Sequence, residues 1–179
     1  SSEIGQFREW DYAGAVEWFL LDYEKHAKLQ HFVAQLNRFY LSEPALWQRD
    51  MDWLGGFEWI DADNREQSIL SYRRRDAAGK EIVILLNFLP VERADFLLAV
   101  PCAGRYEEIF NSDAAEYGGT GIRNPGSFKT ERALLRNYGD AIRIHVPPMA
   151  AVMFRMTKKA PAERPRKSGK PGKSGKSGK

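Results

Sequence analysis

Apolar residues between positions 15 and 41 recur at spacings of three and four, the repeat of an α-helix with one buried face. The recurring residues are Leu29, Phe32, Val33, Leu36, Phe39 and Tyr40, with polar residues between them. We therefore expect one helix over residues 15–41. Pro44 cannot continue a helix and disfavours helical geometry at Glu43, so the helix should end near Leu41. Residues 3–14 lack the repeat and predict a loop that carries aromatic side chains.

After Trp47 the pattern changes to short runs of β-type residues separated by turn residues. The runs cover residues 57–60, 68–74, 81–88, 96–100, 106–110, 142–146 and 151–156. Short strands at this spacing predict an antiparallel β-sandwich. Residues 82–86 are apolar at every position, which is typical of a strand buried on both faces. Residues 76–79 should form the hairpin loop that joins the second and third strands.

Residues 111–137 are rich in Gly, Asn and Ser and predict a long loop, which in a compact domain is often functional. Four of the aromatic residues fall into two groups. We assign Trp18 and Trp59 to the core, where most large aromatic side chains are buried. Trp10 and Tyr12 lie in a polar loop, so core packing and stacking on a sugar ring both remain open for them.

The composition is that of a globular protein, with 43% apolar and 28% charged residues in 179. This length suits one ordinary domain, or a small domain plus part of another. No apolar run approaches the roughly 20 residues of a membrane helix, and residues 1–6 do not resemble a secretory signal. Cys102 is the only cysteine, which excludes an intrachain disulfide and fits a reducing compartment. We expect a cytoplasmic protein, and the missing initial methionine suggests a piece of a longer chain.

The net charge of +3 combines two different regions. Residues 158–179 hold nine Lys or Arg and one acid, which leaves a net charge of −5 on residues 1–157. The last part of this basic region, residues 168–179, consists of four Gly-Lys triplets, three beginning with Ser and one with Pro. It has no apolar residues to offset the entropy of ordering, so we expect a disordered tail. Its alternative role is to bind a polyanion. Since the basic residues lie in a tail and not on a structured face, we do not expect nucleic-acid binding.

The residue types for independent catalysis or metal binding are sparse. His26 and His31 differ by five positions and would point to different faces of a helix, so we expect no metal site. The glycine-rich run at 117–121 lacks the lysine and spacing of a phosphate-binding loop. No catalytic triad can be argued from the spacing of the nucleophiles, and we expect no cofactor. Carboxylate pairs suit glycosidic chemistry, but among 24 acidic residues they identify nothing alone.

Nine short motifs, taken in order, resemble the 1,4-α-glucan branching enzymes of the α-amylase superfamily. They are residues 2–10 (SEIGQFREW), 17–21 (EWFLL), 36–40 (LNRFY), 44–47 (PALW), 56–60 (GFEWI), 87–91 (NFLPV), 111–113 (NSD), 117–119 (YGG) and 146–150 (VPPMA). Each motif is weak alone, and their common register is specific. The resemblance covers residues 2–156, and the Lys-Gly-Ser tail matches no element of the family.

The resemblance implies an α+β fragment of a larger enzyme. Residues 1–50 would be the last loop and eighth helix of a (β/α)8 barrel, residues 51–157 a C-terminal antiparallel β-sandwich, and residues 158–179 the disordered tail. Because the barrel neighbours of the helix are missing, we expect its apolar face to be exposed and residues 55–157 to be better ordered than residues 1–50.

The resemblance also implies a parent enzyme that transfers a cut α-1,4-glucan chain to a 6-hydroxyl. In the family an Asp forms the covalent intermediate and a Glu is the acid/base, both upstream of Ser1, so this chain should be non-catalytic. The alternative is a glucan-binding β-module without chemistry, in which the sandwich or the 111–137 loop holds glycogen. The expected partners are an α-glucan and the upstream barrel.

Residues 3–12 would then lie at the carboxyl ends of the barrel strands, where active sites of this architecture are built. Within this loop Arg8, Glu9, Trp10 and Tyr12 are expected to border a glucan-binding groove.

Overall fold

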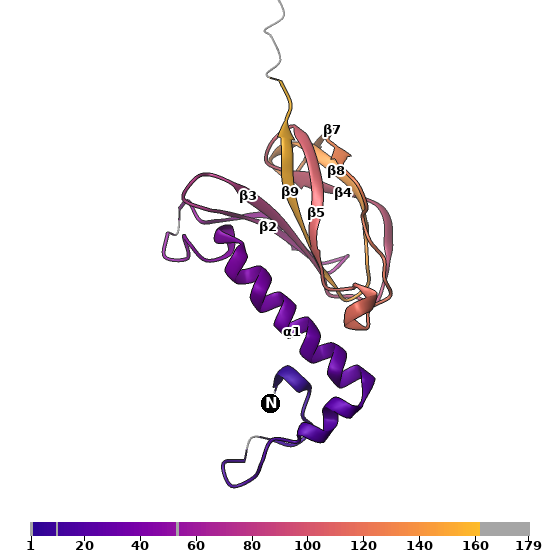
Figure 1. Cartoon of the computed structure of the whole chain (residues 1–179). Coiled ribbons are helices and arrows are strands. Elements are labelled where there is room, and N and C mark those ends of the chain that lie inside the picture. Colours follow the sequence, from indigo (N-terminus) through magenta and orange to yellow (C-terminus); the bar gives the residue numbers. More distant parts are fainter. Residues whose placement is uncertain (1, 10, 53, 162–179) are drawn as a thin grey trace, which may run out of the picture.

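The structure is a computed structural model that describes residues 2–9, 11–52 and 54–161. The amino-terminal part contains the 3-10 turns η1 (Ser2–Ile4) and η2 (Trp18–Asp22), the helix α1 (Glu24–Ser42) and the 3-10 turn η3 (Pro44–Leu46). Strands follow, interrupted by the 3-10 turn η4 (Ala115–Tyr117). In Figure 1 the amino-terminal half of α1 projects beyond the strands together with η1 and η2.

The described strands form two antiparallel sheets. They are β1 (Phe57–Asn64), β2 (Ile69–Arg75), β3 (Glu81–Asn87), β4 (Arg93–Val100), β5 (Gly104–Asn111), β6 (Phe128–Lys129), β7 (Glu131–Leu135), β8 (Tyr138–Val146) and β9 (Ala151–Lys159). One sheet has the order β1-β2-β3-β9-β5-β6 and the other β4-β8-β7. The predicted antiparallel β-domain is confirmed.

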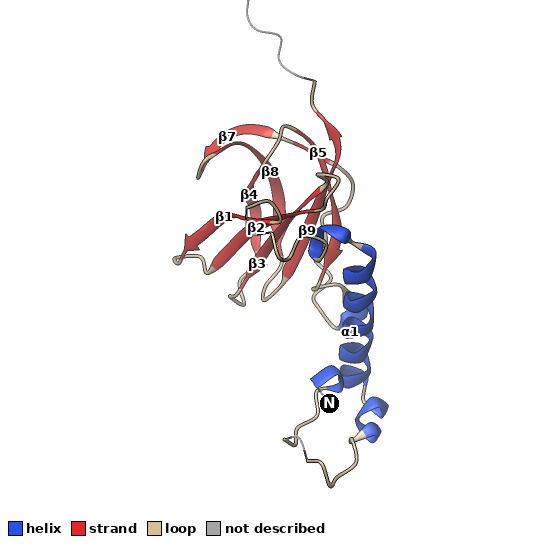
Figure 2. Cartoon of the chain, turned by 90° about the vertical axis from the view of Figure 1, so that its left-hand side faces the viewer, coloured by secondary structure: helices blue, strands red, loops and turns tan. Residues whose placement is uncertain are grey.

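The apolar run of β3 is buried on both faces, as the sequence predicts. Val83 and Leu85 join the cluster between the two sheets, together with Ile142 from β8. Ile82 and Ile84 point to the opposite face and join a second cluster that includes residues of α1. Helix, six-stranded sheet and three-stranded sheet therefore form three layers, and Figure 2 shows α1 beside the strands.

The expectation that the apolar face of the helix is exposed was wrong. Phe32, Leu36 and Phe39 pack against the outer face of the six-stranded sheet, where the rings of Phe39 and Phe110 lie 4.9 Å apart. The continuous apolar run of β3 already required a cover on that face, and α1 supplies it. At the carboxyl end of α1, Glu43 is buried and forms an ion pair with Arg155 of β9.

The predicted start of the helix at residue 15 was also wrong, whereas its end at Ser42 agrees with the prediction near Leu41. Tyr23 has an extended backbone, with φ −98° and ψ 128°, and separates η2 from α1. Residues 18–21 are apolar at consecutive positions, so they have no single buried face that would extend the helical repeat. Leu20 is buried, but Trp18 is 61% exposed.

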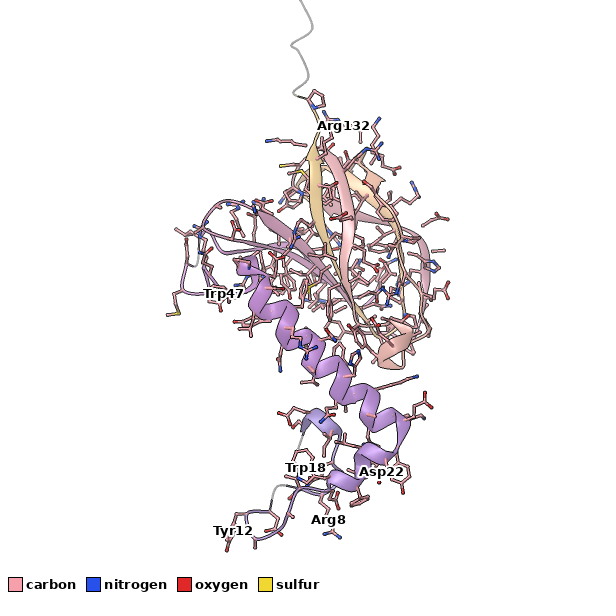
Figure 3. The ribbon with its side chains drawn as sticks, viewed as in Figure 1. Arg8, Tyr12, Trp18, Asp22, Trp47 and Arg132 are labelled. Atoms are coloured by element: carbon pink, nitrogen blue, oxygen red, sulfur yellow. The ribbon has the colours of Figure 1, made fainter. Side chains whose placement is uncertain are left out.

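The assignment of Trp18 and Trp59 to the core was wrong for both residues. Trp59 is 49% exposed and contacts Tyr72 on the outer face of the six-stranded sheet. It lies on the edge strand β1, next to the part of that face that α1 covers. Trp18 lies in η2, away from both sheets (Figure 3).

Two strand boundaries also need correction. The predicted loop 111–137 contains β6 and β7, which the sequence does not reveal because β6 has two residues and the five residues of the edge strand β7 do not alternate between apolar and polar. Strand β9 continues into the predicted tail, since Arg105 pairs with Lys158 and Gly104 with Lys159. The rest of the predicted tail, residues 162–179, lies outside the described residues.

Candidate functional site

The loop between η1 and η2 holds the residues that the sequence singles out, and its base is fixed to α1. His26 Nδ1 lies 2.7 Å from the carbonyl oxygen of Ile4. Gly5 has φ 64°, and a Cβ there would lie 3.0 Å from Leu29 of α1, so a side chain would be strained by both backbone and contact. The backbone N–H of Glu17 donates to Gln6 Oε1 at 3.2 Å. These contacts close the loop.

Three of the four predicted site residues lie around one open hollow of about 430 Å³. Its lining includes Arg8, Glu9 and Tyr12, and the fourth residue, Trp10, lies outside the described residues. Arg8 Nε is 3.2 Å from Glu17 Oε1, and its side chain is 82% exposed. Figure 3 shows Arg8 and Tyr12 at the end of the molecule farthest from the sandwich. The predicted residues are therefore neighbours on an exposed loop.

The groups around this hollow suit binding more than bond cleavage. A guanidinium donates hydrogen bonds to hydroxyl groups, and carboxylates accept hydrogen bonds from them. An exposed phenol ring offers a flat apolar face. Asp11 Oδ1 accepts a hydrogen bond from the N–H of Ala13 at 2.9 Å, which shapes the tip of the loop. The hollow can therefore hold a polar ligand with flat apolar faces.

A second hollow of about 770 Å³ opens between the two sheets, and we call it the intersheet cleft. Its polar lining includes Asp61, Asn64, Gln67, Glu92, Arg93, Asp95 and Arg136, which come from β1, the β1–β2 turn, the amino end of β4 and the β7–β8 turn. Sequence analysis missed this site. No local motif marks it, because only the pairing of the two sheets brings these segments together.

Glu58 and Tyr138 form a hydrogen-bonded pair that joins the two sheets. The hydroxyl of Tyr138 on β8 donates a hydrogen bond of 2.5 Å to Glu58 on β1, which also pairs with Arg73. Burial, followed by the hydrogen bond to Glu58, raises the pKa of Tyr138 to about 12. The hydrogen bond from Tyr138, followed by Arg73, lowers the pKa of Glu58. Neither residue lines a large hollow, so we assign the pair a structural role. Because it joins β1 of one sheet to β8 of the other, we call it the clamp between the sheets.

The glycine-rich part of the predicted long loop is built around a buried aspartate. The N–H groups of Thr120 and Ile122 donate to Asp113 at 2.8 and 3.1 Å. A Cβ on Gly119 would lie 2.2 Å from the carbonyl oxygen of Asp113. Gly119 is therefore needed for the close backbone packing. The hydrogen bonds to Asp113 come from within the same loop and hold its shape.

In residues 2–9, 11–52 and 54–161, no three His, Cys, Asp or Glu residues are grouped as metal ligands. Over the same ranges, none of the helices has the length and apolar character to cross a membrane.

Comparison with known proteins places residues 59–157 in the family described as "Alpha amylase, C-terminal all-beta domain". The chain is 42% identical over 153 residues to the 1,4-alpha-glucan branching enzyme GlgB of Synechococcus sp. (strain CC9902), covering 85% of this chain and 20% of that protein. It is 40% identical over 154 residues to the GlgB of Halothermothrix orenii, covering 86% of this chain and 24% of that protein. The chain thus spans about a fifth to a quarter of these relatives.

Among solved structures, trehalulose synthase MutB from Pseudomonas mesoacidophila MX-45 is similar with a TM-score of 0.46 and 16% identity. The similarity covers 72% of this chain and 18% of that one.

Proposed function

Because the chain belongs to the family of alpha-amylase C-terminal all-beta domains, we propose that it is the C-terminal part of a 1,4-α-glucan branching enzyme. The observation that carries this proposal is the identity of about 40% to several GlgB proteins. A match of 153 residues in a chain of 179 must include residues 27–153, so it extends from the β-domain into α1. The similarity therefore covers the packed helix and sandwich together.

In the parent enzyme the reaction is a retaining transglycosylation. An upstream Asp attacks the anomeric carbon of an α-1,4-glucan while an upstream Glu protonates the leaving oxygen. The same Glu then takes the proton of a 6-hydroxyl, which displaces the Asp and forms the α-1,6 branch. These carboxylates belong to barrel strands outside this chain, so residues 1–179 have a supporting and binding role.

Residues 1–50 supply the last loop and eighth helix of the barrel. The surface of the described part supports this role, because Phe19, Tyr23 and Leu41 are 57%, 61% and 72% exposed. Phe19 lies in η2, Tyr23 directly precedes α1 and Leu41 lies near its end, and none of them belongs to the clusters that pack on the sheets, so their side chains remain available to upstream barrel neighbours. The single Cys102 fits a cytoplasmic enzyme.

Arg8, Glu9, Trp10 and Tyr12 border the glucan-binding groove of the parent. The shared hollow that the three described members line, on an exposed loop at the end of the molecule farthest from the sandwich, supports this proposal. They hold the glucan by hydrogen bonds and by ring stacking.

A chimeric enzyme tests the proposal. The matching segment of the Synechococcus GlgB is replaced by residues 2–157 of this chain, and branching of amylose is followed by the loss of iodine absorbance and by release of branches with a debranching enzyme. The chimera should form α-1,6 branches, and this chain alone should form none. A folded chimera without activity would show that the assignment is wrong, and branching by the isolated chain would contradict the non-catalytic role.

A further inference from the structure

The 111–124 loop carries two of the motifs that resemble those of branching enzymes, NSD at 111–113 and YGG at 117–119. It begins at the last residue of β5 and contains η4, which contacts α1. Figure 1 shows η4 at the end of the sandwich that lies toward the amino-terminal half of the helix. Residues 5–17 connect η1 to η2, and we call them the η1–η2 loop. Neither motif lines the hollow of that loop, so the proposed function leaves both without a role.

The NSD motif and Asn124 anchor the 111–124 loop to the sandwich. The N–H of Ser112 donates to the carbonyl oxygen of Ala151 at 3.0 Å, and the N–H of Ala151 donates to Ser112 Oγ at 2.8 Å. Asn124 accepts from the N–H of His145 at 2.7 Å and donates to the carbonyl oxygen of the same residue at 2.8 Å. Asp113 and Asn124 are both buried. Because hydrogen bonds of buried polar groups are costly to break, the loop is a rigid part of the sandwich.

Tyr117 lies at the tip of this loop and contacts both the six-stranded sheet and α1. Its ring centroid is 6.3 Å from that of Phe110 on β5, with the ring planes at 26°. It also lies 5.3 Å from the ring of Phe32 and 5.7 Å from the ring of His31, both on α1. Aromatic rings at such separations contribute packing energy beyond their buried area. Tyr117 therefore joins the rigid loop tip to the helix.

Gly118 brings the loop close to the amino-terminal half of α1. Its φ of 89° lies in the left-handed region, which favours glycine. A Cβ at this position would lie 3.6 Å from Cδ of Lys28. Lys28 precedes Phe32 by about one helical turn, roughly 6 Å along the axis. Tyr117 and Gly118 together therefore contact α1 over residues 28–32.

The base of the η1–η2 loop is attached to the same part of α1. Residues 4–5 lie against His26 and Leu29, and the carbonyl oxygen of residue 4 is 2.7 Å from His26 Nδ1. His26 and Lys28 differ by two positions, and so do Leu29 and His31. Two positions on an α-helix correspond to about 200°, so the members of each pair point to opposite sides. The helix is therefore held between the tip of the 111–124 loop and the base of the η1–η2 loop.

We propose that Tyr117 is a positioning residue for the glucan groove. By fixing α1, it sets the place of the η1–η2 loop and of the side chains Arg8, Glu9 and Tyr12. The identity of the groove rests on the proposed function. In a (β/α)8 barrel the loop that precedes a helix lies at the active-site face, so the amino end of α1 points to the groove. Because close-packed interiors transmit displacement, a ring of the β-domain affects how the glucan is held without touching it.

The first test uses the 179-residue chain and backbone-amide NMR. Tyr117→Ala removes the ring, whereas Tyr117→Phe keeps it. The signals of Gly5 and Glu17 report on the two ends of the η1–η2 loop. In Tyr117→Ala both signals should shift, and hydrogen exchange at both amides should accelerate about fivefold or more, because the loop loses its fixed support. In Tyr117→Phe both signals should stay in place, with exchange within about twofold of that of the unchanged chain.

Phe128→Ala is the matched control. Phe128 follows the same loop, and its ring lies 6.3 Å from that of Phe154 in the core between the sheets, on the face of the six-stranded sheet opposite to α1. Its removal should lower the stability of the sandwich in urea unfolding but should leave the signals of Gly5 and Glu17 in place. The control therefore separates the position of the loop from general stability.

The chimeric branching enzyme gives the second test, with amylose as the substrate. Tyr117→Ala should raise KM about fivefold or more and leave kcat within about twofold, because the loop holds the glucan equally in the ground state and the transition state. Tyr117→Phe should restore the KM of the unchanged chimera. Phe128→Ala should leave KM within about twofold, since it does not disturb the support of α1.

Unmoved signals of Gly5 and Glu17 in the Tyr117→Ala chain would overturn the proposal. An active chimera in which Tyr117→Ala and Phe128→Ala change KM equally would overturn it as well, because the ring would then matter only for stability. A chimera that is inactive before any substitution contradicts the proposed function instead. The NMR comparison in the 179-residue chain then still decides whether Tyr117 fixes the η1–η2 loop.

Discussion

At the scale of single residues, Glu43 joins α1 to the sandwich. Its side chain is 6% exposed and pairs with Arg155, 112 residues later in the chain. Arg155→Met should destabilise the protein by about 1–3 kcal/mol, because it leaves a buried carboxylate without its charged partner while Arg155 itself is 41% exposed. Urea unfolding measures the loss. Lys28→Met is the control: it breaks the exposed pair with Glu24 on α1 and should cost about 0.5 kcal/mol or less.

Combining Arg155→Met with Glu43→Gln should recover part of the stability, because the buried charge is then gone. Equal losses for Arg155→Met and Lys28→Met would contradict a buried pair.

The clamp between Tyr138 and Glu58 gives a prediction for pH. The folded pKa of Glu58 is lowered, so its contribution to stability is present above its unfolded pKa and disappears as pH falls through the folded value. Tyr138→Phe removes the leading cause of that shift. The pKa of Glu58, followed by NMR of its carboxyl carbon, should rise, and stability should fall less steeply with acid. Tyr40→Phe on α1 should change neither quantity, and a Glu58 pKa unaffected by Tyr138→Phe would refute the clamp.

Sequence could suggest some of these residues and not others. Arg8, Glu9 and Tyr12 were found because a polar loop with aromatic residues matches a family motif, and they do line one hollow. Sequence alone could not reveal two pairs, Glu43 with Arg155 and Glu58 with Tyr138. Their members are 112 and 80 residues apart, and only the sheet pairing fixes which charges meet.

At the scale of elements, α1 is held by ring packing on the outer sheet face. Phe39→Ala should destabilise the protein by about 1–3 kcal/mol, because it removes a partly buried ring whose centroid lies 4.9 Å from that of Phe110. Hydrogen exchange should accelerate in α1 more than in β8, whose apolar residues lie between the sheets. Leu41→Ala is the control, because Leu41 lies on the exposed side of α1, and it should change hydrogen exchange little. Uniform acceleration in α1 and β8 would mean that helix and sandwich open as one unit.

Elements with a strong apolar pattern could be predicted from the sequence, and elements without one could not. The end of α1 follows from its helical repeat and from Pro44, and the central strand β3 follows from its continuous apolar run. Strand β7 shows no alternation because it lies on a sheet edge, and Tyr23 interrupts the helix without a proline or glycine to mark it. The intersheet cleft depends on the register shift of β4, which pairing decides and local sequence does not.

At the scale of the whole molecule, the β-domain has one core between its sheets and a second apolar face that needs α1. The second face contains Ile82, Ile84, Phe110 and Met153, all buried in the complete structure. A protein that begins at residue 55 keeps the core between the sheets but exposes this face. It should elute as oligomers in size-exclusion chromatography with light scattering and bind a hydrophobic dye, because exposed apolar patches promote association.

A protein that begins at residue 23 provides the control, since it loses η1 and η2 but keeps α1. It should behave as the full chain does in the same column and dye measurements. Adding Ile84→Thr and Met153→Thr to the protein that begins at residue 55 should restore the monomer, because the substitutions make the bared face polar and leave Val83, Leu85 and the core between the sheets in place. If the shorter protein is monomeric without them, the helix is dispensable as a cover of the outer sheet face.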